Sequence, residues 1–539
     1  MLITLTAPAF AETWYIENGD ITVKASGTEG KNTVSQGDKK DVEDTNTIIT
    51  NQNKDKASSN TVTIEAEDHK VEVTLDNVNI ETGSGSALTS KGDVTLTLKG
   101  DNHLTGGISG NGYGGSGIAS TGSLTISGGE TDSLTAQGGS GENGGDGISS
   151  KDLTISGGTV TATGGNSTGI VGSGGSGIHS GGDVTISGGT VTATGGDSTG
   201  SDGSGGYGIY SSSTTTISGG TVTATGGDST GSYSSGGYGI YSSGVTISGG
   251  STVTANGGSG KDGSGDGIFS FDPVAISGGT VTANGGDSKD GYGGDGIRSD
   301  GGVTISGNTV NAAGGNGGKV GGYGICSFDR VAISGGTVTA NGGDGSSGGD
   351  GIRSGDIDLS GSLELTAKAG SPNGKALSQK GSELVLDTIK DKLGPGAKVT
   401  ATDANGETKQ VSVPRPVEPE KPVIPEESSS SSGGGSAAPS APASPLPGLT
   451  VTDKDGQRIS YTSTQSGNTL TVCVGRFTAS FRISLAALRQ LRAEGIETIT
   501  FQTILCSTTL SVDELLAMGG EDAEAVLTHR LTDSSLTVS

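Results

Sequence analysis

Aromatic and arginine side chains recur at fixed positions around a short repeated motif, Gly-Ile-x-Ser. The variable residue of the motif reads, along the chain, Ala119, Ser149, His179, Tyr210, Tyr241, Phe269, Arg298, Cys326 and Arg353. Aromatic rings can stack on the apolar face of a sugar, and tyrosine adds a hydroxyl. The planar fork of arginine fits a carboxylate. The pattern predicts a groove for polysaccharide, including acidic sugars, lined by Tyr207, Tyr210, Tyr238, Tyr241, Phe269, Phe271, Arg298 and Arg353. The alternative is that exposed aromatic residues simply favour strands and shield neighbouring turns.

Aspartate also recurs in these repeats, before the Gly-Ile pair and after a Gly-Gly pair. Carboxylates stacked in successive turns, together with backbone carbonyls, are the oxygen ligands that calcium takes. The sequence therefore suggests calcium as a possible cofactor, with Asp266 and Asp295 as the expected ligands. The alternative is a solvated loop in which aspartate supports turns.

Catalysis is not expected, because the repeats are too uniform to have specialised one turn. The chain has only four histidines, with no pairing by spacing. A lyase or hydrolase would need a base and clustered carboxylates, and the nearest candidates are Asp266, Asp295 and Arg298. Rows of threonine such as Thr192, Thr223 and Thr254 offer another surface, of the kind by which some β-solenoids bind ice. Threonine is also simply a good strand residue.

The elements that must position these side chains follow from the repeat. The motif returns about every 30 residues between Gly117 and Gly351, a period typical of solenoids. Each repeat holds three short segments in which apolar and polar residues alternate, which indicates strands. Glycine pairs permit sharp bends between them. The sequence predicts an all-β protein whose body is a right-handed parallel β-helix, a three-sided β-solenoid, with isoleucine and valine inside.

The remaining segments complete the predicted domain organisation. Residues 1–11 end in Ala-Phe-Ala and are expected to be a signal peptide with a truncated n-region. Residues 12–413 form the β-helix, with regular repeats at 105–370 and flanks that act as caps. Residues 414–448 are a Pro/Ser/Gly linker, and residues 449–539 a small C-terminal α+β module whose helices begin at Ser484 and Ser511. The protein is expected to be extracellular or on the cell surface.

Charge narrows the range of partners. The formal net charge is −26, which excludes nucleic acid and an anionic membrane surface because no basic footprint exists. No later segment approaches the ~20 apolar residues that span a bilayer.

The segments WYIENGDITV, VTLDNVNI, VTISGGTVTATGGD and GGDGI resemble the carbohydrate-binding β-helix family of clostridial-type (Firmicutes) surface proteins, over roughly residues 12–410. The resemblance implies a polysaccharide-lyase-like fold, binding of plant or cell-wall polysaccharide including acidic sugars, and calcium sites. The expected function is that of a secreted or cell-surface carbohydrate-binding protein without catalysis. Alternatives are a structural spacer or adhesin that contacts a host or cell-surface protein and, less favoured, a polysaccharide lyase or hydrolase.

Overall fold

The structure is a computed structural model that describes residues 12–27, 30–109, 111–414 and 448–538, the last range with gaps at 454–456, 460, 467, 475–477, 504–506, 519–522 and 530–533. The expected signal peptide and most of the expected linker lie outside the described residues. The chain divides into two compact units, Met1–Glu418 and Pro419–Ser539. The division falls within the segment predicted to be a linker, and each unit is described by itself.

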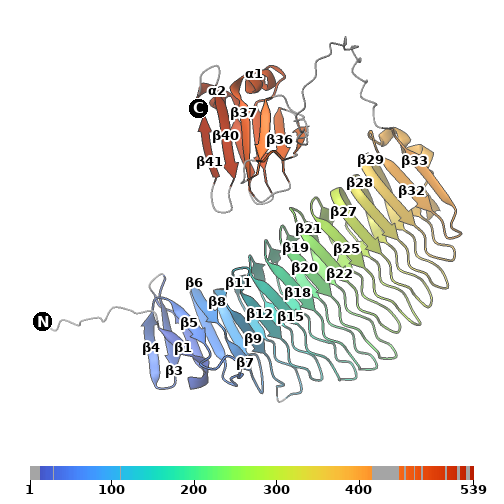
Figure 1. The fold of residues 1–539 in the computed structure, drawn as a ribbon. Helices are drawn as coiled ribbons and strands as arrows, with labels where there is room; N and C mark the ends of the chain where they lie inside the picture. The colour runs from blue at the N-terminus through green and yellow to red at the C-terminus, as the bar shows by residue number, and fades with distance from the viewer. Residues whose placement is uncertain are drawn as a thin grey trace, which may run out of the picture. The chain divides into compact units, whose positions relative to one another are not determined.

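The first unit is a β-solenoid of about 14 turns, which confirms the predicted fold class (Figure 1). Strands of successive turns pair in parallel and form three sides. The first side holds the Gly-Ile-x-Ser strands β10 (Ile118–Ser120), β13 (Ile148–Ser150), β16 (Ile178–Ser180), β23 (Ile268–Ser270) and β26 (Ile297–Ser299). The second side holds β11 (Ser123–Ser127), β14 (Asp152–Ile155), β17 (Val184–Ile186) and β24 (Val274–Ile276). The third side holds β12 (Ser133–Gln137), β15 (Thr159–Thr163), β18 (Thr190–Thr194), β20 (Thr221–Thr225), β22 (Thr252–Asn256) and β25 (Thr280–Asn284).

Some strands run through the bends between sides. They are β19 (Ile209–Ile217) and β21 (Ile240–Ile247) on the first and second sides, β27 (Val303–Ala313) on the second and third, and β28 (Ile325–Asn341) and β29 (Ile352–Lys368) on all three. Alternation turns every second side chain inward, so that equivalent residues stack. Ile178, Ile209 and Ile240 align in register and are fully buried. The aliphatic columns expected from the sequence are therefore present.

The loop between the third and first sides is more ordered than a variable connection would be. Its glycines form a continuous ribbon of backbone hydrogen bonds from Gly85 to Gly370: the N–H of Gly196 donates to Gly175 O (2.8 Å), and the N–H of Gly206 to Gly196 O (2.8 Å). A Cβ on Gly206 would lie 2.0 Å from Gly175 O. Glycine is needed here for close approach of backbones, a role that the sequence reading, which assigned glycine pairs to bends, did not anticipate.

The flanks are solenoid turns as well as caps. Ile21, Val62 and Leu88 align with Ile118 of the regular repeats. The N-terminal turns contain β1 (Thr13–Tyr15), the 3-10 helix η1 (Ile16–Asn18), β2 (Ile21–Ala25), β5 (Thr47–Thr50), β6 (Val62–Asp76), β7 (Asn79–Glu81), β8 (Leu88–Lys99) and β9 (Asp101–Thr105). The antiparallel strands β3 (Asn32–Gln36) and β4 (Lys39–Asp44) continue from β2. The regular turns thus extend beyond residues 105–370, and antiparallel pairing supplies the cap.

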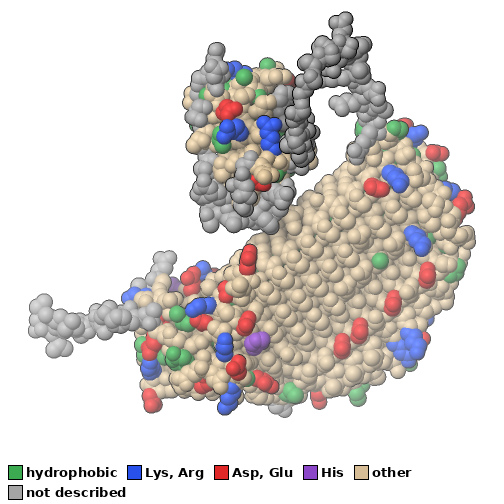
Figure 2. Space-filling view, viewed as in Figure 1, with side chains coloured by type: hydrophobic (Ala, Val, Ile, Leu, Met, Phe, Trp, Pro, Cys, Tyr) green, Lys and Arg blue, Asp and Glu red, His purple; other side chains and the backbone are tan. Residues whose placement is uncertain are grey.

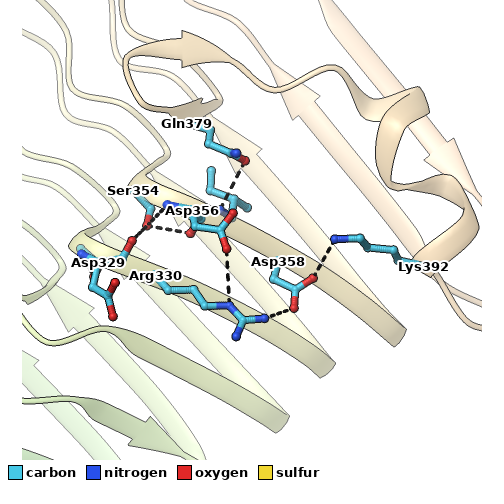
Figure 3. Close-up of polar contacts among 9 residues, drawn as sticks. Asp329, Arg330, Ser354, Asp356, Asp358, Gln379 and Lys392 are labelled. Carbon is cyan, nitrogen blue, oxygen red and sulfur yellow. Dashed lines mark hydrogen bonds and ion pairs between the residues drawn. The ribbon is translucent and has the colours of Figure 1, made fainter.

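The C-terminal end is closed in a similar way. It consists of β30 (Leu377–Gln379), β31 (Ser382–Glu383), the 3-10 helix η2 (Leu386–Lys392), β32 (Lys398–Thr402) and β33 (Thr408–Ser412), with β33 antiparallel to β32. Figure 3 shows the charged side chains that join β28 and β29 to η2 on the outside of the second side. Arg330 pairs with Asp356 and Asp358, and Lys392 of η2 pairs with Asp358 at 3.3 Å. These exposed pairs link the cap to the last turns.

The second unit is a small α+β module. One sheet contains β34 (Leu449–Thr452), β37 (Ala479–Ser484), β40 (Glu524–His529) and β41 (Ser534–Val538), and the other β35 (Thr462–Ser466), β36 (Thr469–Cys473), β38 (Thr498–Gln502) and β39 (Ser507–Ser511). Its helices are α1 (Leu485–Ala493) and α2 (Val512–Ala517), and the hydroxyls of Ser484 and Ser511 cap them as predicted. Among the described residues, no helix has the length and apolar character to cross a membrane.

Candidate ligand-binding site

Two neighbouring columns of side chains follow the first side. The motif column holds the variable residue of Gly-Ile-x-Ser, which the parallel register aligns from turn to turn: Ser149, His179, Tyr210, Tyr241, Phe269, Arg298, Cys326 and Arg353. The flanking column holds the residue before the motif glycine, whose carbonyl accepts the glycine N–H of the preceding turn: Ser176, Tyr207, Tyr238, Asp266, Asp295, Tyr323 and Asp350. Asp146 holds the corresponding position one turn earlier.

The predicted aromatic residues form one continuous cluster, here called the aromatic ladder: Tyr207, Tyr210, Tyr238, Tyr241, Phe269 and Phe271. Within the motif column, ring centroids lie 5.4 Å apart for Tyr210 and Tyr241 and 5.1 Å apart for Tyr241 and Phe269, with interplanar angles of 9° and 17°. Tyr207 stacks on Tyr238 in the flanking column and contacts Tyr241 across the columns. The columns therefore act as one surface.

Stacking changes what the ladder offers a ligand. Because neighbouring rings cover one another's faces, the half-buried tyrosines present mainly edges and hydroxyls. Phe269 is only 8% exposed, since Phe271 packs against it at a centroid distance of 4.9 Å and an angle of 90°. Phe271 of the ladder and Phe328 beyond it are 47% and 66% exposed, so another molecule can cover these rings. Burial raises the pKa of Tyr207 and Tyr238, so these hydroxyls stay neutral.

Both arginines lie against aromatic rings at one end of the ladder. The Arg298 guanidinium carbon lies 5.6 Å from the Phe269 ring centroid and 5.4 Å from that of Phe328. The Arg353 guanidinium lies over Tyr323 at 4.9 Å and donates to its hydroxyl. Such contacts hold a guanidinium in place without removing its charge. The aromatic ladder together with Arg298 and Arg353 is called the binding strip below.

Asp266 and Asp295 occupy the flanking column beside Arg298. Both are only 5% exposed, and burial raises the pKa of Asp266 and brings that of Asp295 to about 6. One oxygen of each carboxyl accepts a backbone N–H of the next turn, from Asp295 at 2.6 Å and from Tyr323 at 2.7 Å. Burial disfavours the charge of Arg298, but the Asp266 and Asp295 carboxylates outweigh it and raise the pKa of Arg298.

This arrangement does not fit the calcium site expected from the sequence. Calcium takes about 6–8 oxygen ligands, whereas one oxygen of each of these carboxyls accepts a backbone N–H and both carboxyls lie beside a guanidinium. Among the described residues, no group of three or more His, Cys, Asp or Glu side chains is placed to hold a metal ion. Calcium therefore enters no step of the proposal below. The calcium hypothesis stays a prediction, and a melting temperature that rises with calcium, and no longer does so in Asp266→Asn/Asp295→Asn, would support it.

The structure adds residues that the predicted groove leaves out. His179 extends the motif column by one turn and contacts Tyr210, while Tyr323 and Phe328 hold the arginines. The sequence could have indicated these residues, because each lies at or next to a repeat position that aligns with the ladder. What the sequence could not give is which neighbouring side chains meet, because that depends on rotamers and on the separation of the two columns.

The third side carries a different surface. Thr190, Thr221 and Thr252 align in one row and Thr192, Thr223 and Thr254 in another. From β12 to β28 the outward positions of this side carry no charged residue. In Figure 2 a broad area of the solenoid is accordingly free of charged and hydrophobic colours. The threonine rows expected from the sequence are present, and nothing in their geometry identifies a ligand.

Comparison of the chain with known protein families, with characterised proteins and with solved structures finds no match. The resemblance to a carbohydrate-binding β-helix family stays a prediction.

Proposed function

We propose that the protein binds polysaccharide without catalysis along the binding strip. The supporting observation is the continuous contact of six aromatic side chains, followed directly by Arg298, on one side of the solenoid. Ring edges and tyrosine hydroxyls contact the hydroxyl groups of the polymer. The exposed ring of Phe271 covers apolar sugar surface, and the arginines bind the carboxylates of acidic sugars.

The rigidity of the strip supports binding of a long polymer. Backbone register fixes the position of each ring, and Tyr241 stacks on the rings of both neighbouring turns, which restricts its rotamers. A prearranged surface loses little conformational entropy when a ligand binds. The strip follows the solenoid axis over several turns, so an extended chain can contact many of its side chains at once. A secreted or cell-surface location is proposed with this function, because such polymers lie outside the cell.

The burial of Asp266 and Asp295 favours binding over catalysis. A lyase or hydrolase needs a base or carboxylates that reach the substrate, and these two, the nearest candidates for a catalytic pair, are covered. An adhesin or spacer is the second candidate. It is favoured by a separate observation, the exposed apolar residues Ile170, Val171 and Tyr233 on the ordered loops. Retention of the protein by cells stripped of polysaccharide would support that alternative.

The test is retention of the full chain on insoluble cellulose-like and pectin-like material. Tyr210→Ala with Tyr241→Ala should weaken retention about tenfold, the effect of losing two ring contacts of ~0.5–1.5 kcal/mol each. Arg298→Ala with Arg353→Ala should weaken only the binding of uronate polymers. The matched control for the tyrosine variant is Thr223→Ala with Thr254→Ala, which lie on the third side in the same turns as Tyr210 and Tyr241. Equal retention of all folded variants, or no retention of the wild type, would refute the proposal.

A further inference from the structure

A second charged end lies at His179, at the opposite end of the aromatic ladder from Arg298. The His179 ring centroid is 4.7 Å from that of Tyr210 in an edge-to-face contact. Register places His179 four turns before Arg298, through Tyr210, Tyr241 and Phe269. Because neighbouring strands lie about 4.8 Å apart, the two positions are separated by about 19 Å along the solenoid.

Asp146 of the flanking column fixes how the imidazole is presented. One oxygen of Asp146 accepts the N–H of Ser176 at 2.8 Å, and the other lies 3.3 Å from His179 Nδ1. The His179 side chain is 43% exposed. Since Nδ1 faces Asp146, Nε2 is the ring nitrogen available to a ligand. A neutral ring accepts a hydrogen bond there, whereas a protonated ring donates one and carries a positive charge.

The surroundings favour the protonated ring. The hydrogen bond with Asp146 raises the pKa of His179, burial opposes this, and the charge of Asp146 adds to the rise. The neighbouring turns supply Ser149 and the Tyr210 ring in register with His179. Lys151, two residues beyond Ser149, lies within 4.0 Å of Asp152. Asp146 is thus the charged group among the described residues that acts on this imidazole.

We propose that His179 binds a carboxylate of an acidic polymer that also contacts Arg298. Retention of acidic polymers then weakens as the pH rises, whereas retention of neutral polymers is the same at low and high pH. This inference rests on the proposed function. Uronate carboxylates are ionised on both sides of the histidine titration, so a pH effect specific to acidic polymers reports on the protein. Asp295, with a pKa of about 6 beside Arg298, contributes to that effect at the other end of the ladder, and the part that His179→Gln removes is the part due to His179.

The test measures affinity of the full chain for uronate oligomers and for a neutral glucan. From about pH 6 to about pH 8.5, wild-type affinity for uronate should fall about tenfold, the size of one charge-assisted hydrogen bond. His179→Gln should bind uronate weakly at both pH values, with an unchanged affinity for the glucan. His103→Gln is the matched control, because His103 lies exposed on the third side in β9.

A titration of the imidazole by NMR, without ligand, provides an independent readout. The pKa of His179 should lie above its ordinary value and return toward it in Asp146→Asn, which retains an acceptor for the Ser176 N–H. Uronate binding that is unaffected by pH and by His179→Gln would overturn this inference and leave the proposed function standing. An ordinary pKa for His179 in the wild type would also overturn it. Failure to bind any polysaccharide at either pH would overturn both.

Discussion

The first and third sides of the solenoid use the same backbone in opposite ways. Both consist of short parallel strands aligned in register over the same turns, and both rest on fully buried aliphatic columns. The third side repeats threonine in turn after turn. The first side changes residue at almost every turn, through His179, tyrosines, Phe269 and arginines.

This difference distinguishes residues that the fold itself favours from residues that can vary without affecting the fold. Threonine is favoured at outward positions of a strand. This preference is enough to explain why threonine repeats along the third side. Strand preference and cross-strand pairing also favour rings stacked in register, but they do not require the change of residue that places Arg298 beside the rings. The first side is therefore the better candidate for a ligand, and the following changes test how far the two sides can be treated separately.

Substitutions in the core that both sides share should cause the largest loss of stability. Ile209→Ala and Ile240→Ala should each lower the free energy of unfolding by ~2–5 kcal/mol, because both side chains are fully buried and leave cavities. Val222→Ala, which lies between two outward threonines of the third side, should also destabilise the protein, by less because fewer atoms are lost. Denaturant unfolding measures all three. A loss confined to one side would show that the sides unfold independently.

Buried acids occur on the first side and should make stability depend on pH. Burial raises the folded-state pKa of Asp295 to about 6, so the folded protein binds a proton more tightly than the unfolded chain does. Stability should therefore fall as the pH rises from about 4 to about 6, by on the order of 2–3 kcal/mol. Asp295→Asn should reduce this dependence, leaving the part due to the raised pKa of Asp266, and should melt at a higher temperature at neutral pH. Parallel wild-type and variant profiles would contradict the assignment.

The glycine ribbon should tolerate no side chain, although it lies in a loop. In Gly206→Ala the new Cβ would meet Gly175 O, and the required backbone shift should cost ~1–3 kcal/mol. Gly250→Ala is the matched control, since nothing lies within 4 Å of a Cβ there. Thermal unfolding of the two variants gives the comparison. Equal stability would mean that the loop can move away without loss.

The sequence predicted the features that repeat and missed those that depend on neighbours. Period and alternation were enough for the three sides, the buried isoleucines and the column that holds Tyr210 and Arg298. The glycine ribbon escaped prediction because the sequence does not say which glycines approach one another. The covered faces of the tyrosines and the commitment of Asp266 to a backbone N–H escaped it for the same reason. Helix caps in the C-terminal module were predictable because they are local.

The smallest effect is expected on the third side, where it decides whether the comparison holds. Thr223→Lys with Thr254→Lys interrupts a row of aligned threonines. Lysine can extend into solvent from these outward positions, so stability should change by no more than about 0.5 kcal/mol. Affinity for neutral polysaccharide should also stay unchanged, because the strip lies on another side.

The threonine rows leave ice binding as an alternative function. If the wild type inhibits ice recrystallisation and this variant does not, the uniform side is the functional one. Unchanged ice growth with both proteins, together with a loss of polysaccharide retention in the Tyr210 and Tyr241 variant, would assign function to the side that varies.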